Sequence, residues 1–198
     1  MTRFSLVTLL RHAFDSSVKW PEQWRAAAPK PRYDAVVVGA GGHGLATAYY
    51  LAAEHGMRDI GVVEKGWLGG GNTGRNTTII RSNYLWPESQ ALYDHAVKLW
   101  DGLSRTLNYN VMYSPRGVMV LAHNHHEVLT AQRHIHANRL SGIDNEWLTP
   151  EQAKAFCPLL NTSASLRYPV HGAALQRRGG TARHDAVAWG FARAANAL

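Results

Sequence analysis

Three glycines early in the chain have the spacing of a turn that binds phosphate groups. Gly39, Gly41 and Gly44 form the pattern G-x-G-x-x-G, and Glu64 follows 20 residues after the last of them. In such a pattern the first glycine makes a tight turn, the second lets the backbone approach a pyrophosphate, and the third lets a helix pack closely on a strand. The acid accepts hydrogen bonds from ribose hydroxyls, and its charge disfavours a 2′-phosphate. These residues predict a dinucleotide site and argue against NADP.

The elements around this motif have the order that it needs. Residues 33–38 form a short apolar run rich in valine, which is typical of a buried parallel strand. Residues 45–55 are helical in composition, Gly56 is a candidate C-cap, and residues 59–63 read as a second strand. The helix has one apolar face: Leu45, Ala48, Tyr49 and Ala52. A glycine motif between a strand and a helix is a specific signal, so we predict an α/β fold with a Rossmann-like, parallel-stranded nucleotide-binding domain.

The segment after Glu64 favours FAD over NAD. Residues 65–76 are rich in glycine, amides and hydroxyls, which disfavour a helix and suit a polar cradle, and residues 77–81 read as a short strand. A second backbone loop of this kind, able to reach ribitol and flavin, is expected in FAD-binding domains. The residues expected to bind FAD are Gly39, Gly41, Gly42, His43, Gly44, Glu64, Lys65, Gly71, Asn72, Arg75, Asn76, Thr77, Thr78 and Ile80.

Composition narrows the class of protein further. The formal net charge is +7, but the lysines and arginines are scattered singly along the 198 residues, which favours anionic cofactors and substrates over nucleic acid. No apolar run is long enough to cross a membrane. The single cysteine, Cys157, cannot form an internal disulfide. The histidines between 123 and 136 lie on a loop and a helix without converging, so we expect no metal site.

Four further stretches carry a family resemblance. They are NTTIIRSNYLW at 76–86, SPRGV at 114–118, EWLTPEQ at 146–152 and RYPV at 167–170. With the nucleotide motif and the step from Glu64 to Gly66, they resemble the glycine/D-amino-acid oxidase group of flavoproteins. Within that group they look like the β subunits of heterotetrameric sarcosine oxidases, and the likeness runs from about residue 33 to the last residue.

The resemblance implies an activity and a substrate-binding residue. FAD, held non-covalently, would oxidise sarcosine at its N-methyl carbon, and the product would be glycine with formaldehyde, or methylene-tetrahydrofolate when tetrahydrofolate is present. Oxygen would be reduced to hydrogen peroxide. Arg81 falls where related amine oxidases grip the substrate carboxylate, a role that suits a guanidinium. Its alternative is a structural ion pair. Related single-chain enzymes carry an arginine where this chain has Thr78, which is a departure from the pattern.

The resemblance also implies a second flavin. The run GGTARHDAVAW at 179–189 matches the segment where these β subunits attach FMN covalently, with His184 in the linking position and Arg183 near the phosphate. A neutral imidazole is a suitable nucleophile near pH 7. Asp185 is a candidate N-cap for a helix over 185–197. His171 is a rival attachment site, but its flanking residues do not match.

These inferences divide the chain into four parts. We expect an N-terminal extension and linker at 1–32, an FAD-binding domain at 33–110, part of an α+β substrate domain at 111–180, and an FMN-attachment segment with a crossover helix at 181–198. Trp20 and Trp24 either cover the chain's own domain or contact another subunit. Family members of this kind are about twice as long, so we expect a truncated chain whose isolated activity is doubtful.

The implied protein is a cytoplasmic, multi-subunit oxidase. Its partners would be the α, γ and δ subunits, with NAD on one of them. Two alternatives stay open. One is a different FAD-dependent amine or amino-acid oxidase of the same group, and the other is a non-catalytic subunit that keeps the flavin-binding fold.

Overall fold

The computed structural model describes residues 5–15 and 28–198. The chain divides into two compact units, Met1–Arg32 and Tyr33–Leu198. The first contains helix α1 (Leu6–Phe14), an element that we did not expect in the N-terminal extension. Leucines at positions 6, 9 and 10 recur at helical spacing, and this periodicity accounts for the helix. Trp20 and Trp24 lie outside the described residues.

The second unit begins with the predicted nucleotide-binding element. Strand β1 (Ala35–Val38), helix α2 (Gly42–Ala53) and strand β2 (Ile60–Val63) follow one another, and β1 pairs with β2 in parallel. Helix α2 buries the face that the sequence predicted: Leu45, Ala48, Tyr49 and Ala52. The helix ends slightly earlier than expected, with Glu54 as C-cap, and Gly56 takes a left-handed conformation two residues later.

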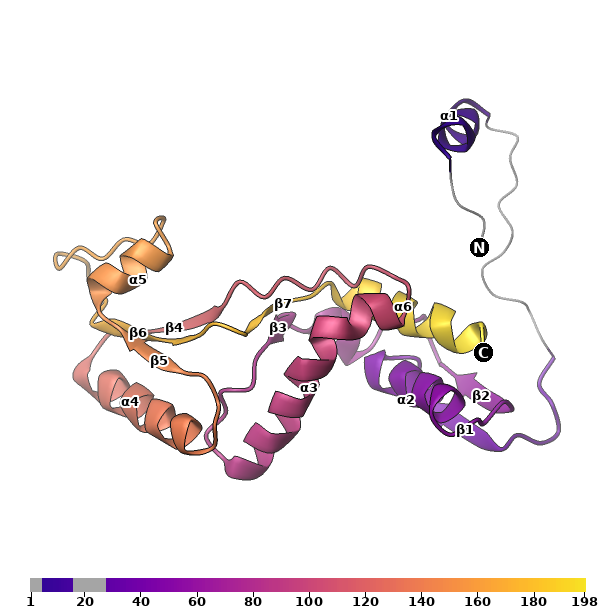
Figure 1. The fold of residues 1–198 in the computed structure, drawn as a ribbon, viewed down its shortest axis with the longest axis horizontal. Helices are drawn as coiled ribbons and strands as arrows, with labels where there is room; N and C mark the ends of the chain where they lie inside the picture. The colour runs from indigo at the N-terminus through magenta and orange to yellow at the C-terminus, as the bar shows by residue number, and fades with distance from the viewer. Residues whose placement is uncertain (1–4, 16–27) are drawn as a thin grey trace. The chain divides into compact units, whose positions relative to one another are not determined.

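An antiparallel sheet lies in the part of the chain predicted to belong to a substrate domain, residues 111–180. Its strands are β4 (Val118–Ala122), β5 (Glu146–Leu148) and β6 (Gly172–Gln176), in the order β4-β6-β5. Helices α4 (His125–Leu140) and α5 (Pro150–Phe156) both contact this sheet (Figure 1). Every residue of the central strand β6 is buried. A small apolar cluster holds α5 against the sheet: Leu148, Ala153, Ala173 and Leu175.

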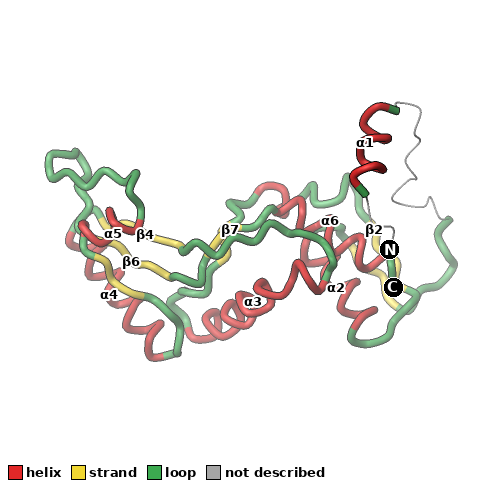
Figure 2. The backbone as a smooth tube through the Cα atoms, turned by 45° about the horizontal axis from the view of Figure 1, so that its top comes forward, coloured by secondary structure: helices red, strands yellow, loops and turns green. Residues whose placement is uncertain are grey.

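Two helices, two short strands and a 3-10 turn, joined by loops, connect these two regions (Figure 2). They are the 3-10 turn η1 (Asn72–Arg75), strand β3 (Ile79–Ile80), helix α3 (Pro87–Thr106), strand β7 (Gly180–Thr181) and helix α6 (His184–Asn196). Strand β3 pairs with β7 in an antiparallel bridge across the sequence. Helix α6 packs along α2, where Phe191 contacts the rings of Tyr49 and Tyr50. The C-terminal helix therefore lies directly against the nucleotide-binding helix.

In the described ranges, 5–15 and 28–198, no helix combines the length and the apolar character needed to span a membrane. The four-part division made from the sequence stays a prediction.

Candidate flavin and substrate site

The glycine motif brings strand β1 and helix α2 into very close contact. Gly39 has φ of +105°, a conformation that suits glycine. A Cβ on Gly44 would stand 2.0 Å from the Gly39 carbonyl oxygen, so no side chain fits there. A Cβ on Gly41, the N-cap of α2, would meet the Thr73 hydroxyl at 3.0 Å. Gly41 thus puts no side chain at the positive end of the helix, where we expect a pyrophosphate.

Thr73 belongs to this site, although the sequence analysis did not select it. Its hydroxyl accepts a hydrogen bond from the Gly42 N–H at 2.8 Å, across 31 residues of sequence. The hydroxyl therefore faces the first turn of α2, where the dinucleotide is expected. The only sequence signal for it was its place in a loop already assigned to FAD.

Glu64 is fixed by two backbone groups at the end of β2. The Ala40 N–H donates to its Oε2 at 2.8 Å, and the Gly66 N–H donates to its Oε1 at 2.9 Å. These two hydrogen bonds lower the pKa of Glu64, with Ala40 the stronger contributor. The carboxylate is therefore ionised and oriented beside the glycine motif, and each oxygen keeps acceptor capacity for a ribose hydroxyl.

The loop after Glu64 is held against the motif by its own backbone. The Gly69 N–H donates to the Ala40 carbonyl at 2.8 Å, and the Gly74 N–H donates to the Gly69 carbonyl at 2.9 Å. The loop includes the 3-10 turn η1, which the sequence analysis did not expect. Most of the residues predicted to bind FAD in this loop are exposed: Lys65, Gly71, Asn72, Arg75, Asn76 and Thr77. His43 is exposed on the first turn of α2.

Thr78 has an unusual backbone conformation. Its φ is +61°, which is rare for a β-branched residue. The Asn76 side chain supports this turn, because its Oδ1 accepts from the Thr78 N–H at 2.7 Å and its Nδ2 donates to the Thr73 carbonyl at 2.6 Å. Ile80, another predicted FAD ligand, follows in strand β3 and is half-buried. Strain of this kind is found at functional sites, where the surrounding contacts maintain it.

Arg81 follows strand β3 and is half-buried. Its Nη1 donates to the Asn83 Oδ1 at 3.1 Å, and its guanidinium lies 4.5 Å from the centre of the Tyr84 ring. Among the described residues it forms no ion pair with a carboxylate. Its described contacts are with neutral groups and leave its charge without a carboxylate partner, as expected of a residue that receives an anionic substrate.

The β3–β7 pair brings the two predicted flavin segments side by side. The Ala182 N–H donates to the Thr78 carbonyl at 3.1 Å, so the residues just before His184 lie against those just before Arg81. His171 instead precedes β6 and donates its N–H to the Ala122 carbonyl, at the opposite end of that strand from β7. Of the two candidate histidines, only His184 is near the FAD-side loop.

His184 is the first residue of α6, and its Nδ1 is buried with no hydrogen-bond partner in the described part of the chain. A buried ring nitrogen without a partner fits a bound group that would supply one. Arg183 is the N-cap of α6, so the prediction of Asp185 as N-cap is wrong. Asp185 lies in the first turn and pairs with Arg183, whose Nε and Nη2 donate to its carboxylate at 3.0 and 2.6 Å. That hydrogen-bonded pair lowers the pKa of Asp185 to about 2.

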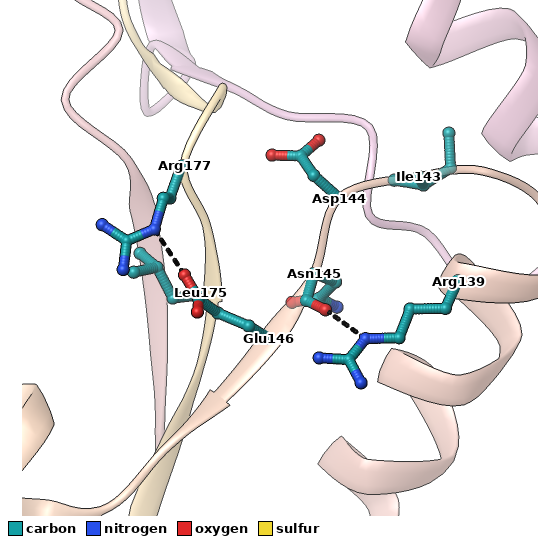
Figure 3. Close-up of a pocket in the computed structure, with 7 residues that line it drawn as sticks. All are labelled: Arg139, Ile143, Asp144, Asn145, Glu146, Leu175 and Arg177. Carbon is teal, nitrogen blue, oxygen red and sulfur yellow. Dashed lines mark hydrogen bonds and ion pairs between the residues drawn. The ribbon is translucent and has the colours of Figure 1, made fainter.

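Two pockets lie in the described part of the chain. One, of about 220 Å³, is formed by α4, the loop after it, β5 and β6 (Figure 3). Its lining residues are Arg139, Ile143, Asp144, Asn145, Glu146, Leu175 and Arg177. None of them is a predicted site residue, and Arg177 is already paired with Glu146. The other, of about 370 Å³, lies on α2 and includes His43. Across the described ranges, no three histidine, cysteine or acidic side chains gather as a metal site would require.

Comparison with known proteins identifies the class. The family model described as FAD dependent oxidoreductase (DAO) matches residues 34–198. The chain therefore belongs to the FAD-dependent oxidoreductase family, which confirms the predicted α/β flavoprotein fold. Among solved structures, L-proline dehydrogenase from P. horikoshii has a TM-score of 0.75 at 28% identity, covering 84% of this chain and 42% of that one. Glycine oxidase from Geobacillus kaustophilus has a TM-score of 0.74 at 23% identity, with 83% and 44% covered, and shows the fold alone.

Within the family, the similarity to one kind of subunit is strong. Sarcosine oxidase subunit beta of Rhodobacter capsulatus is 55% identical over 194 residues, which are 98% of this chain and 47% of that protein. Sarcosine oxidase subunit beta of Rhizobium meliloti is 47% identical over 194 residues, covering 98% and 46%. The resemblance inferred from the sequence is confirmed. The chain spans about half the length of the curated relatives it matches.

Proposed function

We propose that this chain forms the nucleotide-binding and carboxylate-binding part of a sarcosine oxidase β subunit. The observation that carries the proposal is Arg81, a half-buried guanidinium beside the flavin-binding loop whose described contacts are the neutral Asn83 and Tyr84. Its place directly after strand β3 and the loop predicted to bind FAD supports oxidation of a small substrate that carries a carboxylate. The similarity to sarcosine oxidase β subunits supports sarcosine as that substrate.

The residues of the chain fit FAD. Glu64 would bind the adenosine ribose, the first turn of α2 would bind the pyrophosphate, and the loop from Lys65 to Thr78 would face the ribitol and flavin. Bound FAD supplies the two-electron oxidation of the substrate C–N unit. The chain's own part is to orient the substrate, with Arg81 holding its carboxylate in a bidentate contact.

His184 is proposed as the attachment residue for FMN, supported by its unpartnered Nδ1 and by its nearness to the FAD-side loop. Arg183 would contact the FMN phosphate. Its pairing with Asp185 leaves Nη1 as the guanidinium nitrogen not engaged with that carboxylate. A phosphate would share Arg183 with Asp185 or displace the carboxylate.

The finer features of the complex belong to the same proposal. They are the α, γ and δ subunits as partners, NAD on one of them, tetrahydrofolate as acceptor of the one-carbon unit, oxygen as electron acceptor, and a cytoplasmic location. The overall reaction balances as sarcosine, oxygen and water giving glycine, formaldehyde and hydrogen peroxide.

Two measurements test the function. Protein purified from its own cells with its accompanying chains is assayed for sarcosine-dependent peroxide and formaldehyde in a one-to-one ratio. The denatured chain is then weighed, and the peptide containing His184 is expected to carry an FMN-sized mass increment. Absence of both products would refute the oxidase, and an unmodified His184 peptide would refute the attachment site.

A second candidate is a glycine oxidase. The chain is 34% identical to glycine oxidase of Bacillus subtilis over 98 residues, 48% of this chain and 25% of that protein. Arg81 would serve a glycine carboxylate equally well. Glyoxylate and ammonia from glycine, without formaldehyde from sarcosine, would favour this candidate.

A further inference from the structure

Buried carboxamide side chains form hydrogen bonds with the irregular backbone that follows Arg81. Residues 82–85 lie between β3 and α3 without belonging to either. Three amide side chains from three different elements bind this backbone: Gln90 of α3, Asn138 of α4 and Gln176 of β6. All three are at most 1% exposed. A loop held by so many buried polar groups is built to keep one conformation.

Gln176 makes the contacts nearest to Arg81. Its Oε1 accepts from the N–H groups of Ser82 and Asn83 at 2.8 and 3.3 Å, and its Nε2 donates to the Ser82 hydroxyl at 2.8 Å. The Gln176 side chain therefore binds both the backbone N–H and the side-chain hydroxyl of Ser82, the residue that follows Arg81. These contacts span 93 and 94 residues of sequence.

The orientation of the Gln176 amide is itself fixed. Its Nε2 also donates to the Asp144 Oδ1 at 3.1 Å, which requires the Oε1 to face the two backbone N–H groups. Arg178 holds Asp144 through its Nε at 2.8 Å and its backbone N–H at 3.1 Å, and its Nη2 reaches Asp94 of α3 at 2.8 Å. Hydrogen bonds from Lys98 and Arg178 keep the pKa of Asp94 low against the opposing effect of burial.

Residues 83 and 84 connect these buried amides to the Arg81 side chain. Asn83, whose N–H binds Gln176, accepts the Arg81 guanidinium on its side-chain oxygen. Tyr84 lies under that guanidinium, and its carbonyl accepts from Gln90 at 2.8 Å and from Asn138 at 2.6 Å. Both groups that orient the guanidinium are thus fixed through backbone atoms held by buried amides.

We propose that Gln176 is a positioning residue for the carboxylate-binding Arg81. An apolar residue of similar size would fill the same space without the cost of removing an amide from water. The buried amide of Gln176 therefore serves to fix the conformation of residues 82 and 83 rather than to fill space. Gln176 does not touch the substrate; it acts through Ser82 and Asn83. The inference rests on the proposed role of Arg81.

The test uses the flavin-loaded enzyme with Gln176→Leu and, separately, with Gln176→Met, which has the length of glutamine but lacks the amide that binds Ser82, Asn83 and Asp144. Thr149→Ala is the control, since it removes the capping box of α5 and has no contact with residues 82–85. For Gln176→Leu we expect the KM for sarcosine to rise about tenfold, with kcat within about twofold of wild type. The affinity for acetate, a carboxylate without an amine, falls by a similar factor, and hydrogen exchange quickens in the peptide at 79–86. Gln176→Met gives the same changes as Gln176→Leu, because it also lacks the amide.

A purely structural role would lower thermal stability in Gln176→Leu and Thr149→Ala alike, and would leave KM and acetate affinity unchanged in both. That result would overturn the inference. If Gln176→Leu does not fold, Gln176→Met decides: weakened acetate affinity in a folded, flavin-loaded protein supports the inference, and wild-type acetate affinity contradicts it. Absence of sarcosine turnover in wild type would refute the proposed function alone, because acetate affinity and hydrogen exchange report on the Arg81 segment without turnover.

Discussion

Replacing Gly44 with alanine tests the close approach on which the nucleotide site depends. The new Cβ would stand 2.0 Å from the Gly39 carbonyl oxygen and 3.2 Å from its carbon, where Cβ contacts below 3.0 Å are essentially never seen. Helix α2 and the turn after β1 must therefore separate by at least about 1 Å, since both contacting atoms belong to the backbone and neither can rotate away. The same movement displaces the first turn of α2 from the Thr73 hydroxyl, which accepts from the Gly42 N–H.

The expected cost follows from overpacking a rigid contact, which destabilises proteins by about 3 kcal/mol at the upper end of the usual range. That value corresponds to a folding equilibrium constant about a hundredfold lower, and to a melting temperature lower by about 6–12 °C in a unit of this size. FAD affinity falls as well, because the N–H groups of α2 lose their alignment.

Gly102→Ala is the matched control. Gly102 also lies in a helix, α3, has no positive φ, and a Cβ there would meet only the Thr106 hydroxyl, at 3.9 Å. Thermal unfolding and FAD titration of both variants against wild type make the comparison. Equal stability of the two variants, or unchanged FAD affinity in Gly44→Ala, would refute the close-approach argument.

Three further predictions concern charged groups of the site. Glu64→Gln weakens FAD binding about tenfold, because the ionised acceptor for the ribose hydroxyls becomes neutral, and fluorescence titration of the apoprotein measures it. Arg81→Lys raises the KM for sarcosine about a hundredfold and changes kcat much less, because a lysine cannot bind a carboxylate through two parallel hydrogen bonds. Steady-state kinetics measure both constants, and an unchanged KM would contradict the prediction. Because the pKa of Asp185 is about 2 in the folded protein against 3.8 ordinarily, its pairing with Arg183 stabilises the fold above about pH 4 and is lost as the pH falls toward 2. In Asp185→Asn the free energy of unfolding therefore falls less steeply as the pH is lowered from about 5 to about 2, which urea unfolding at a series of pH values measures. An unchanged pH dependence would show that the Asp185–Arg183 pair is not the cause of this loss of stability.

Local patterns were sufficient to predict the nucleotide-binding element. The valine-rich strand, the glycine spacing and the apolar face of α2 are all encoded within about thirty residues, and each was found where expected. Helix α1 was missed because its apolar periodicity is short. The N-cap of α6 was misplaced because a good capping residue, Asp185, stands two positions inside the helix.

The remaining features depend on contacts between distant parts of the chain. Thr73 reaches Gly42 and Gln176 reaches Ser82 through hydrogen bonds that leave no periodic signal in the sequence. A glutamine at the end of a strand has many possible partners, and only the fold selects the backbone beside Arg81. The candidate residues Arg81 and His184 came from a family resemblance, whereas the β3–β7 contact between their segments came from the structure.

The β3–β7 pair also bears on the order in which the protein folds. The βαβ element pairs strands only about 25 residues apart, whereas β3 and β7 are separated by about a hundred residues. Loop closure over the longer distance costs more entropy and is slower, so the nucleotide-binding element forms early and the contact between the Arg81 and His184 segments forms late. The nucleotide-binding element is then formed before the His184 segment pairs with the Arg81 segment, so the two segments predicted to bind flavins come together only late in folding.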